Sequence, residues 1–155
     1  MSGSSAPQDV VDLVSKFGVD EGYYTSTTKN YLEADVRSEF IDPLLQALGW
    51  DTANKAAVTP LYREVVREES QEREDSAAKK PDYTLRHNGK ARLYVEAKKP
   101  SVNILTHFKS IAQARSYGYT QGHPISALTN FKDLSVYDTS IPVTEVSLPR
   151  AWPCS

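Results

Sequence analysis

Three charged side chains stand at the ends of two short alternating runs within residues 78–100, AKKPDYTLRHNGKARLYVEAKKP. Asp82 opens the first run, and Glu96 and Lys98 close the second. Two neighbouring carboxylates repel each other unless a divalent cation supplies positive charge, and Mg²⁺ suits such oxygen ligands. A lysine beside the cation can orient or deprotonate a bound water, or stabilise charge that develops on phosphorus. These residue types therefore indicate metal-assisted hydrolysis of a phosphodiester.

The turn between the two runs decides whether these side chains can meet. A two-residue turn at residues 88–89 sends Asp82 and Glu96 to opposite faces, because side chains alternate along a strand. A three-residue loop at residues 87–89, with its glycine as a left-handed bulge, places Asp82 opposite Tyr94 instead. We predict the second register, which puts all three charged side chains on one face.

Charge is unevenly distributed along the chain. Residues 1–75 carry seven Lys/Arg and fifteen Asp/Glu, a net charge of −8. Residues 76–123 carry nine Lys/Arg and, as their only acids, Asp82 and Glu96, a net charge of +7. A basic surface attracts phosphates, although acidic and basic faces can also simply balance each other within a fold. The candidate DNA-contacting residues are Lys79, Lys80, Lys99, Lys109 and Arg115.

Apolar residues recur at helical spacing over residues 32–48, and Pro43 inside this stretch is expected to kink or restart the helix. Wound as a helix, the stretch places Glu33 and Arg37 on its buried face, where charges must be paired or used. They form an internal ion pair or contribute to the site. If the helix begins later, Glu39 becomes the candidate acid.

A second helix is predicted over residues 102–117, with Gly118 as its end. Gln113 and Tyr117 are four residues apart and lie away from its apolar stripe. An amide and a phenol in this arrangement could hold a phosphate or orient Lys98. The alternative is an ordinary solvated helix face.

The remaining elements complete a mixed pattern. A short helix is expected to end at Gly18, a strand is expected over residues 58–68, and the segments HPISALTN and LSVYDT read as two further strands. Helix, strand, hairpin, helix and strands in this order predict an α/β (α+β) fold, a mixed β-sheet flanked by α-helices.

A length of 155 residues suits one domain. We expect a tail and short helix over residues 1–20, the domain over residues 21–148, and a second tail over residues 149–155. No apolar run is long enough to span a membrane, and the N-terminus lacks the pattern of a signal peptide. One cysteine, Cys154, gives no disulfide framework, which favours a cytoplasmic setting.

Four motifs in order resemble a known family. PDY and EAK, with thirteen residues between Asp82 and Glu96, are similar to the PD-(D/E)xK nuclease signature, and QARSY resembles the QxxxY motif that follows it in one branch. The stretch EADVR…FIDPLLQALGW resembles the leading helix of N-terminal nuclease domains in type I restriction subunits and in fused type IIG restriction-modification enzymes. ALTNFKDLSVYD resembles their closing strand pair. The resemblance covers about residues 30–139.

The resemblance implies a restriction-endonuclease-like core and a metal-dependent endodeoxyribonuclease that uses Mg²⁺, with Mn²⁺ as a substitute. It makes Asp82 and Glu96 the metal ligands and Lys98 the catalytic lysine. The further site residues that it implies are Glu33, Arg37, Gln113 and Tyr117.

The implied partner is double-stranded DNA, with dimerisation on DNA as a possibility. The sequence has no GxxxxGK[ST] motor loop and no NPPY-type methyltransferase motif, so translocase, specificity and methyltransferase functions would belong to other domains or subunits. One alternative is a nuclease-like fold without catalysis that binds nucleic acid or protein. Another is a purely structural hairpin whose basic segment docks an acidic partner.

Overall fold

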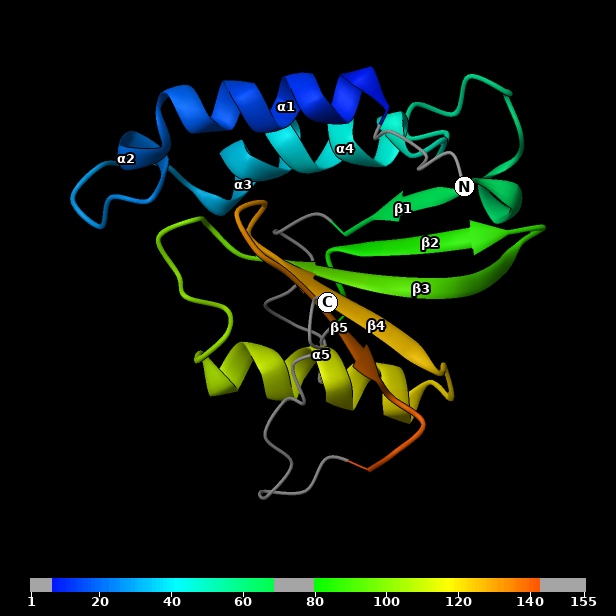
Figure 1. Ribbon diagram of the computed structural model, residues 1–155. Coiled ribbons are helices and arrows are strands. Elements are labelled where there is room, and N and C mark those ends of the chain that lie inside the picture. Colours follow the sequence, from blue (N-terminus) through cyan, green and yellow to red (C-terminus); the bar gives the residue numbers. More distant parts are fainter. Residues whose placement is uncertain (1–6, 69–79, 143–155) are drawn as a thin grey trace, which may run out of the picture.

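The structure, a computed structural model, describes residues 7–68 and 80–142 (Figure 1). The first part of the chain is helical and consists of α1 (Gln8–Val19), α2 (Glu21–Tyr24), α3 (Glu33–Val36), the π-helical turn η1 (Arg37–Ile41), α4 (Asp42–Ala47) and the 3-10 turn η2 (Pro60–Tyr62). The remainder consists of β1 (Val65–Arg67), β2 (Tyr83–His87), β3 (Lys90–Ala97), α5 (Phe108–Thr120), β4 (Ile125–Thr129) and β5 (Leu134–Asp138).

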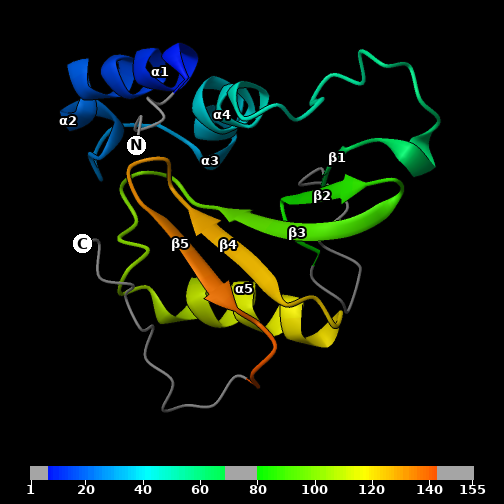
Figure 2. The ribbon, with the colours of Figure 1, turned by 45° about the vertical axis from the view of Figure 1, so that its right-hand side comes forward.

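The five strands form one sheet in the order β1-β2-β3-β4-β5. Strands β3 and β4 are parallel and are joined through α5, whereas the other neighbouring pairs are antiparallel. Helices α1 to α4 cover one side of the sheet and α5 covers the other, as Figures 1 and 2 show. This arrangement confirms the predicted α/β (α+β) fold with a mixed sheet between helices.

Two apolar cores correspond to these two helical layers. The larger core lies under α1 to α4 and includes Phe17, Phe40 and Tyr83. The smaller core lies under α5 and includes Ile111 and Leu128. Because side chains alternate along a strand, β4 contributes to both cores, with Ala127 in the larger core and Leu128 in the smaller one.

The helix predicted over residues 32–48 is one continuous rod from α3 through η1 to α4. Its centre is wider than an α-helix, because the Asp42 N–H bonds to the Arg37 carbonyl five residues earlier. Pro43 follows this turn and has no N–H to donate, so the π turn accommodates the proline without ending the helix. The predicted kink or restart at Pro43 corresponds to the change from the π turn to α4, which begins at Asp42. The rod ends before Gly49, which has a φ of 95°.

The predicted loop of the hairpin is wrong. Asn88 and Gly89 form a two-residue turn with φ of 50° and 72°, the combination of a type I′ turn, and His87 pairs with Lys90. The register then shifts by one residue, because Arg86 pairs with Ala91 whereas Leu85 pairs with Leu93. Arg92 is therefore the extra residue of a bulge in β3.

Because of this bulge, Asp82 and Glu96 lie on the same face of the sheet, as predicted. The prediction reached that result through a three-residue loop, whereas the structure has a two-residue turn and a bulge. A two-residue turn alone would put Asp82 and Glu96 on opposite faces, but the extra residue in β3 reverses the alternation beyond it. Tyr83 pairs with Val95, so the positions next along each strand are Asp82 and Glu96. The predicted pairing of Asp82 with Tyr94 is wrong, whereas the same-face placement is correct.

Several predicted boundaries also differ. Helix α5 begins at Phe108 rather than at residue 102, and Gly118 lies inside it rather than at its end. Gly18 likewise lies inside α1. Only Val65–Arg67 of the expected strand at residues 58–68 pairs in the sheet, because Pro60 opens a 3-10 turn before it. The two strands predicted in HPISALTN and LSVYDT are confirmed as β4 and β5.

Residues 1–6 and the second tail predicted at residues 149–155 lie outside the described residues. The helix predicted within residues 1–20 is α1, and its Phe17 is buried in the larger core. In residues 7–68 and 80–142, no helix is long and apolar enough to cross a membrane.

The position of Gly118 inside α5 leads to a stability prediction. A Cβ at Gly118 would lie 2.7 Å from Thr139 Oγ1, whereas a Cβ at Gly18 in α1 meets nothing within 4 Å. Gly118→Ala is expected to lower the free energy of unfolding by about 1–3 kcal/mol through overpacking. Gly18→Ala, the matched control, should raise it by about 0.5–1 kcal/mol because it removes only backbone freedom. Urea unfolding of both variants checks this, and equal changes in the two would contradict the packing role.

Candidate active site

Asp82 lies immediately before β2 and is fully buried, with 0% exposure. Its Oδ2 accepts a hydrogen bond from the Ala97 N–H at 2.7 Å, and its Oδ1 lies 3.4 Å from Arg37 Nη1. The first contact ties the carboxylate to the end of β3, and the second ties it to the π turn of the helical layer. Sequence reasoning missed the Ala97 contact because a backbone donor has no signature in residue type.

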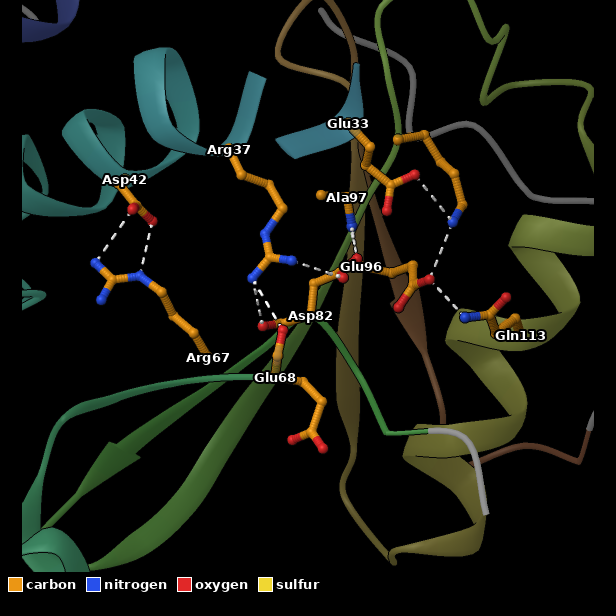
Figure 3. Close-up of polar contacts among 10 residues, drawn as sticks. Glu33, Arg37, Asp42, Arg67, Glu68, Asp82, Glu96, Ala97 and Gln113 are labelled. Carbon is orange, nitrogen blue, oxygen red and sulfur yellow. Dashed lines mark hydrogen bonds and ion pairs between the residues drawn. The ribbon is translucent and has the colours of Figure 1, made fainter. Parts of the chain in front are cut away.

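Glu96 is 3% exposed and faces α5 near the end of β3 (Figure 3). Its Oε1 receives hydrogen bonds from Lys98 Nζ at 3.1 Å and from Gln113 Nε2 at 2.5 Å. The predicted acid–lysine pair is thus in contact. Gln113, from α5, holds the carboxylate of Glu96 in place.

The open choice between Glu33 and Glu39 is decided by geometry. Glu33 begins α3, and its Oε2 lies 3.6 Å from Lys98 Nζ (Figure 3). Glu39 is exposed and instead accepts a hydrogen bond from the Tyr31 hydroxyl at 3.4 Å. Glu33 therefore belongs to the cluster. Glu33 and Arg37 each contact an oppositely charged residue outside their own helix, Lys98 and Asp82 respectively.

The Lys98 ammonium lies between two acids, and this fixes its charge. Burial lowers the pKa of Lys98, but the carboxylates of Glu96 and Glu33 raise it by more, so the pKa lies above its ordinary value. The lysine is therefore protonated at neutral pH. In this state it donates hydrogen bonds and stabilises negative charge, and it does not accept a proton.

The helix face with Gln113 and Tyr117 is turned toward the sheet rather than toward solvent. The ring of Tyr117 packs edge-on against Tyr94, with ring centroids 4.7 Å apart. Burial raises the pKa of the Tyr117 phenol. Gln113 donates to Glu96 Oε1, the same oxygen that accepts from Lys98. The expectation that Gln113 and Tyr117 hold a phosphate or orient Lys98 stays a prediction.

The predicted DNA-contacting residues do not all lie on the surface. Lys99 and Lys109 are exposed, and Lys80 is exposed and lies 3.2 Å from Glu68. Arg115 is only 8% exposed and is one of the buried residues of α5. The DNA-contacting role of Arg115 stays a prediction, and its burial places it apart from the exposed lysines. Lys79 lies outside the described residues.

The donor chemistry of the cluster fits a small hard cation. In the part of the chain that the structure describes, no group of three or more His, Cys, Asp or Glu side chains is arranged to hold a metal ion. Asp82 and Glu96 offer two carboxylates at the junction of β2 and β3 (Figure 3). This is the number that Mg²⁺ commonly takes from a protein, because it retains water and substrate phosphate oxygens as its other ligands.

A mixed sheet between helices, with Asp82, Glu96 and Lys98 gathered where β2 and β3 meet, defines a restriction-endonuclease-like core. The family model described as the type I restriction enzyme R protein N terminus matches residues 64–142, about half of the chain. The chain belongs to this family, which confirms the resemblance to type I restriction subunits.

The chain is also similar to a fused restriction-modification enzyme, the second class of protein that its motifs resemble. The chain is 41% identical, over 134 residues, to the type II restriction enzyme and methyltransferase RM.Eco57I of Escherichia coli. The matched region covers 86% of this chain and 13% of that protein, so the chain spans about an eighth of the length of its relative. No solved structure matches the chain significantly.

The contact between Arg37 and Asp82 leads to a stability prediction. Arg37 has a side-chain exposure of 16%, and its removal leaves the buried Asp82 carboxylate without this cation. Arg37→Met is expected to lower the free energy of unfolding by about 2–3 kcal/mol, because an uncompensated buried charge is costly. Arg92→Met, at the exposed bulge of β3, is the control and should change it by less than about 0.5 kcal/mol. Urea unfolding measures both, and similar losses would contradict the pairing.

Proposed function

We propose that this chain is the DNA-cleaving module of a restriction-modification enzyme, an endodeoxyribonuclease that depends on Mg²⁺ and accepts Mn²⁺ in its place. The observation that carries the proposal is the convergence of Asp82, Glu96 and Lys98 where two strands meet. Membership of the restriction R-subunit family and similarity to a fused restriction enzyme and methyltransferase support it.

Asp82 and Glu96 are the residues that would hold the metal. When bound, Mg²⁺ supplies Lewis-acid polarisation of the phosphodiester and lowers the pKa of a water that attacks phosphorus. Lys98 is protonated and donates hydrogen bonds to the phosphate oxygens on which charge develops. We propose charge stabilisation as its role.

The other site residues position these three. Arg37 and the Ala97 N–H hold the two oxygens of Asp82, and Gln113 holds Glu96. Glu33 lies beside Lys98, with its Oε2 3.6 Å from Lys98 Nζ, and helps to position the ammonium. Side chains fixed in this way lose little freedom when substrate binds, which is how a hydrolytic site lowers its barrier.

The proposed substrate is double-stranded DNA in the cytoplasm. The chain matches 13% of a relative that is named as both restriction enzyme and methyltransferase. Specificity, methyltransferase or translocase functions therefore belong to other domains or subunits that act with this one. Cleavage of both strands requires two such sites, so we include dimerisation on DNA in the proposal.

The direct test is plasmid cleavage by the purified chain with Mg²⁺ or Mn²⁺. Asp82→Asn, Glu96→Gln and Lys98→Gln should each reduce the rate at least about 100-fold, because each removes a group that acts on the reacting phosphate. Lys98→Arg keeps the positive charge and should retain part of the activity. The control variant Glu39→Gln alters an exposed acid in the helical rod that also carries Glu33, and it should cleave at the normal rate.

Metal binding provides a separate readout. Calorimetric titration with Mn²⁺ should show one binding event that Glu96→Gln abolishes and Lys98→Gln retains, since the lysine is not a ligand. Circular dichroism establishes that each variant is folded. Nicking that survives in all three site variants, or Mn²⁺ uptake that is unchanged by Glu96→Gln, would falsify the proposed site.

A further inference from the structure

A second polar feature begins at Arg37 and leads away from the cluster. An open groove of about 1250 Å³ runs along the sheet edge at β1, between this strand and the segment of residues 52–63. Four arginines line it, and the one acid among its described lining residues is Glu68. The lining arginines are Arg37, Arg63, Arg67 and Arg86.

The groove gathers charge that the sequence distributes over distant segments. Three of its arginines come from the first 75 residues, which carry a net charge of −8, and Arg86 comes from the basic hairpin. The regional charge of the sequence therefore concealed this surface. Folding brings these guanidinium groups together because β1 pairs with β2, with Val65 opposite Leu85.

The outer three arginines are available to a ligand. Arg63 is exposed, and its guanidinium makes no polar contact within residues 7–68 and 80–142. Arg67 holds Asp42 through two contacts of 3.2 Å, from Nε to Oδ1 and from Nη2 to Oδ2, and its side chain is 38% exposed. Arg86 Nη1 approaches the Pro60 carbonyl at 3.5 Å, a distance at which a hydrogen bond is weak. An exposed contact such as that of Arg86 is cheaply exchanged for phosphate oxygens, whereas the two-point pair of Arg67 with Asp42 opens at a higher cost.

The wall opposite β1 is held in place by its own side chains. The Asp51 carboxylate accepts hydrogen bonds from the N–H groups of Lys55 and Ala56. The Asn54 side-chain amide both donates to and accepts from the backbone of Val58. A groove that is fixed before binding loses less conformational entropy when it is filled.

The groove is also fixed at its far end by the hairpin tip. A Cβ at Gly89 would lie 3.4 Å from both the Leu61 carbonyl and the Tyr62 ring, so η2 packs directly on the turn. Thr52 also lines the groove, and its hydroxyl is buried and lacks a hydrogen-bond partner among the described residues.

The positions of the arginines match an extended polyanion rather than a single phosphate. Arg63 and Arg67 lie before and at the end of β1, four residues apart, which is roughly 13 Å along a strand. Arg86 lies in β2, four residues after Asp82, which precedes the strand; this separation is again roughly 13 Å. Each DNA strand advances about 3.4 Å per base pair, so this distance corresponds to about four base pairs.

Arg37 makes the groove continuous with the cluster. It lines the groove, its Nη1 contacts Asp82 Oδ1, and its Nη2 lies 3.4 Å from the Glu68 carbonyl. Figure 3 shows Arg67, Arg37 and Asp82 following one another toward Glu96 and Gln113. A strand held at its phosphate by the cluster would thus pass into the groove.

We propose that this arginine groove binds the sugar–phosphate backbone of duplex DNA on one side of the cleaved bond, with Arg63, Arg67 and Arg86 as the contacting residues. The inference rests on the proposed function for the identity of the polyanion. Guanidinium groups suit the task because they bind phosphate oxygens in pairs and stay charged. The groove adds a second surface to the one expected from Lys80, Lys99 and Lys109.

The test measures binding of a fluorescent 24-base-pair duplex by anisotropy in EDTA, so that no strand is cut. The triple variant Arg63→Gln/Arg67→Gln/Arg86→Gln should bind roughly 30-fold more weakly at low salt. The slope of log K against log salt concentration should fall by about 3, close to one for each phosphate that the variant no longer neutralises. The control removes equal charge away from the groove: Lys16→Gln/Lys29→Gln/Lys132→Gln should weaken binding less than about 3-fold.

A single variant, Arg63→Gln, separates loss of DNA binding from loss of folding. Arg63→Gln removes no polar contact among the described residues, so it should unfold at the same urea concentration as the unaltered chain and still bind about 3-fold more weakly. Equal losses in the groove and control triples, no loss with Arg63→Gln, or no duplex binding by the unaltered chain at low salt each overturn the proposal. A different result would overturn the proposed function alone. In that case DNA cleavage or Mn²⁺ binding would be unchanged by Glu96→Gln, while duplex binding would still depend on the groove arginines.

Discussion

The site depends on the alternation of side chains across the hairpin of β2 and β3. Two acids can converge only when they lie on one face, and a shift of one residue in register would separate them. The type I′ turn alone gives the wrong alternation, and the bulge at Arg92 restores it. The hydrogen bond from the Ala97 N–H to Asp82 then fixes the pairing where the strands meet. Buried carboxylates are costly unless they are paired, which explains why Arg37 and Lys98 accompany them.

The sequence was sufficient to predict features that depend on the spacing of apolar residues or on the chemical type of single residues. It predicted the order of elements, the mixed sheet, the irregularity at Pro43 and the contact between Glu96 and Lys98. It was insufficient where contacts between distant segments decide the outcome. Gly118 looks like a helix end, but it permits α5 to approach Thr139 closely. The bulge at Arg92 has no local signature either, since an exposed arginine there fits a regular strand equally well.

The distribution of charge along the sequence likewise did not predict which charged side chains share a surface. The basic segment suggested that phosphate contacts come from residues 76–123, but Arg115 from that segment is buried and three groove arginines come from the acidic half. Net charge per segment describes the chain before it folds. Strand pairing then determines which side chains share a surface. Only strand pairs and helix packing, which the sequence specifies indirectly, could have located the groove.

The cluster also joins the two halves of the interior. Glu33 and Arg37 come from the helical rod whose Val36 and Phe40 are buried in the larger core, whereas Gln113 lies between Ile111 and Ala114 of the smaller core. Asp82 and Glu96 lie between these layers at the junction of β2 and β3. Their separation is therefore set by how both helical layers pack on one sheet. Since packed interiors deform little, each core holds its own side of the site in place, and neither layer alone would suffice to position both acids.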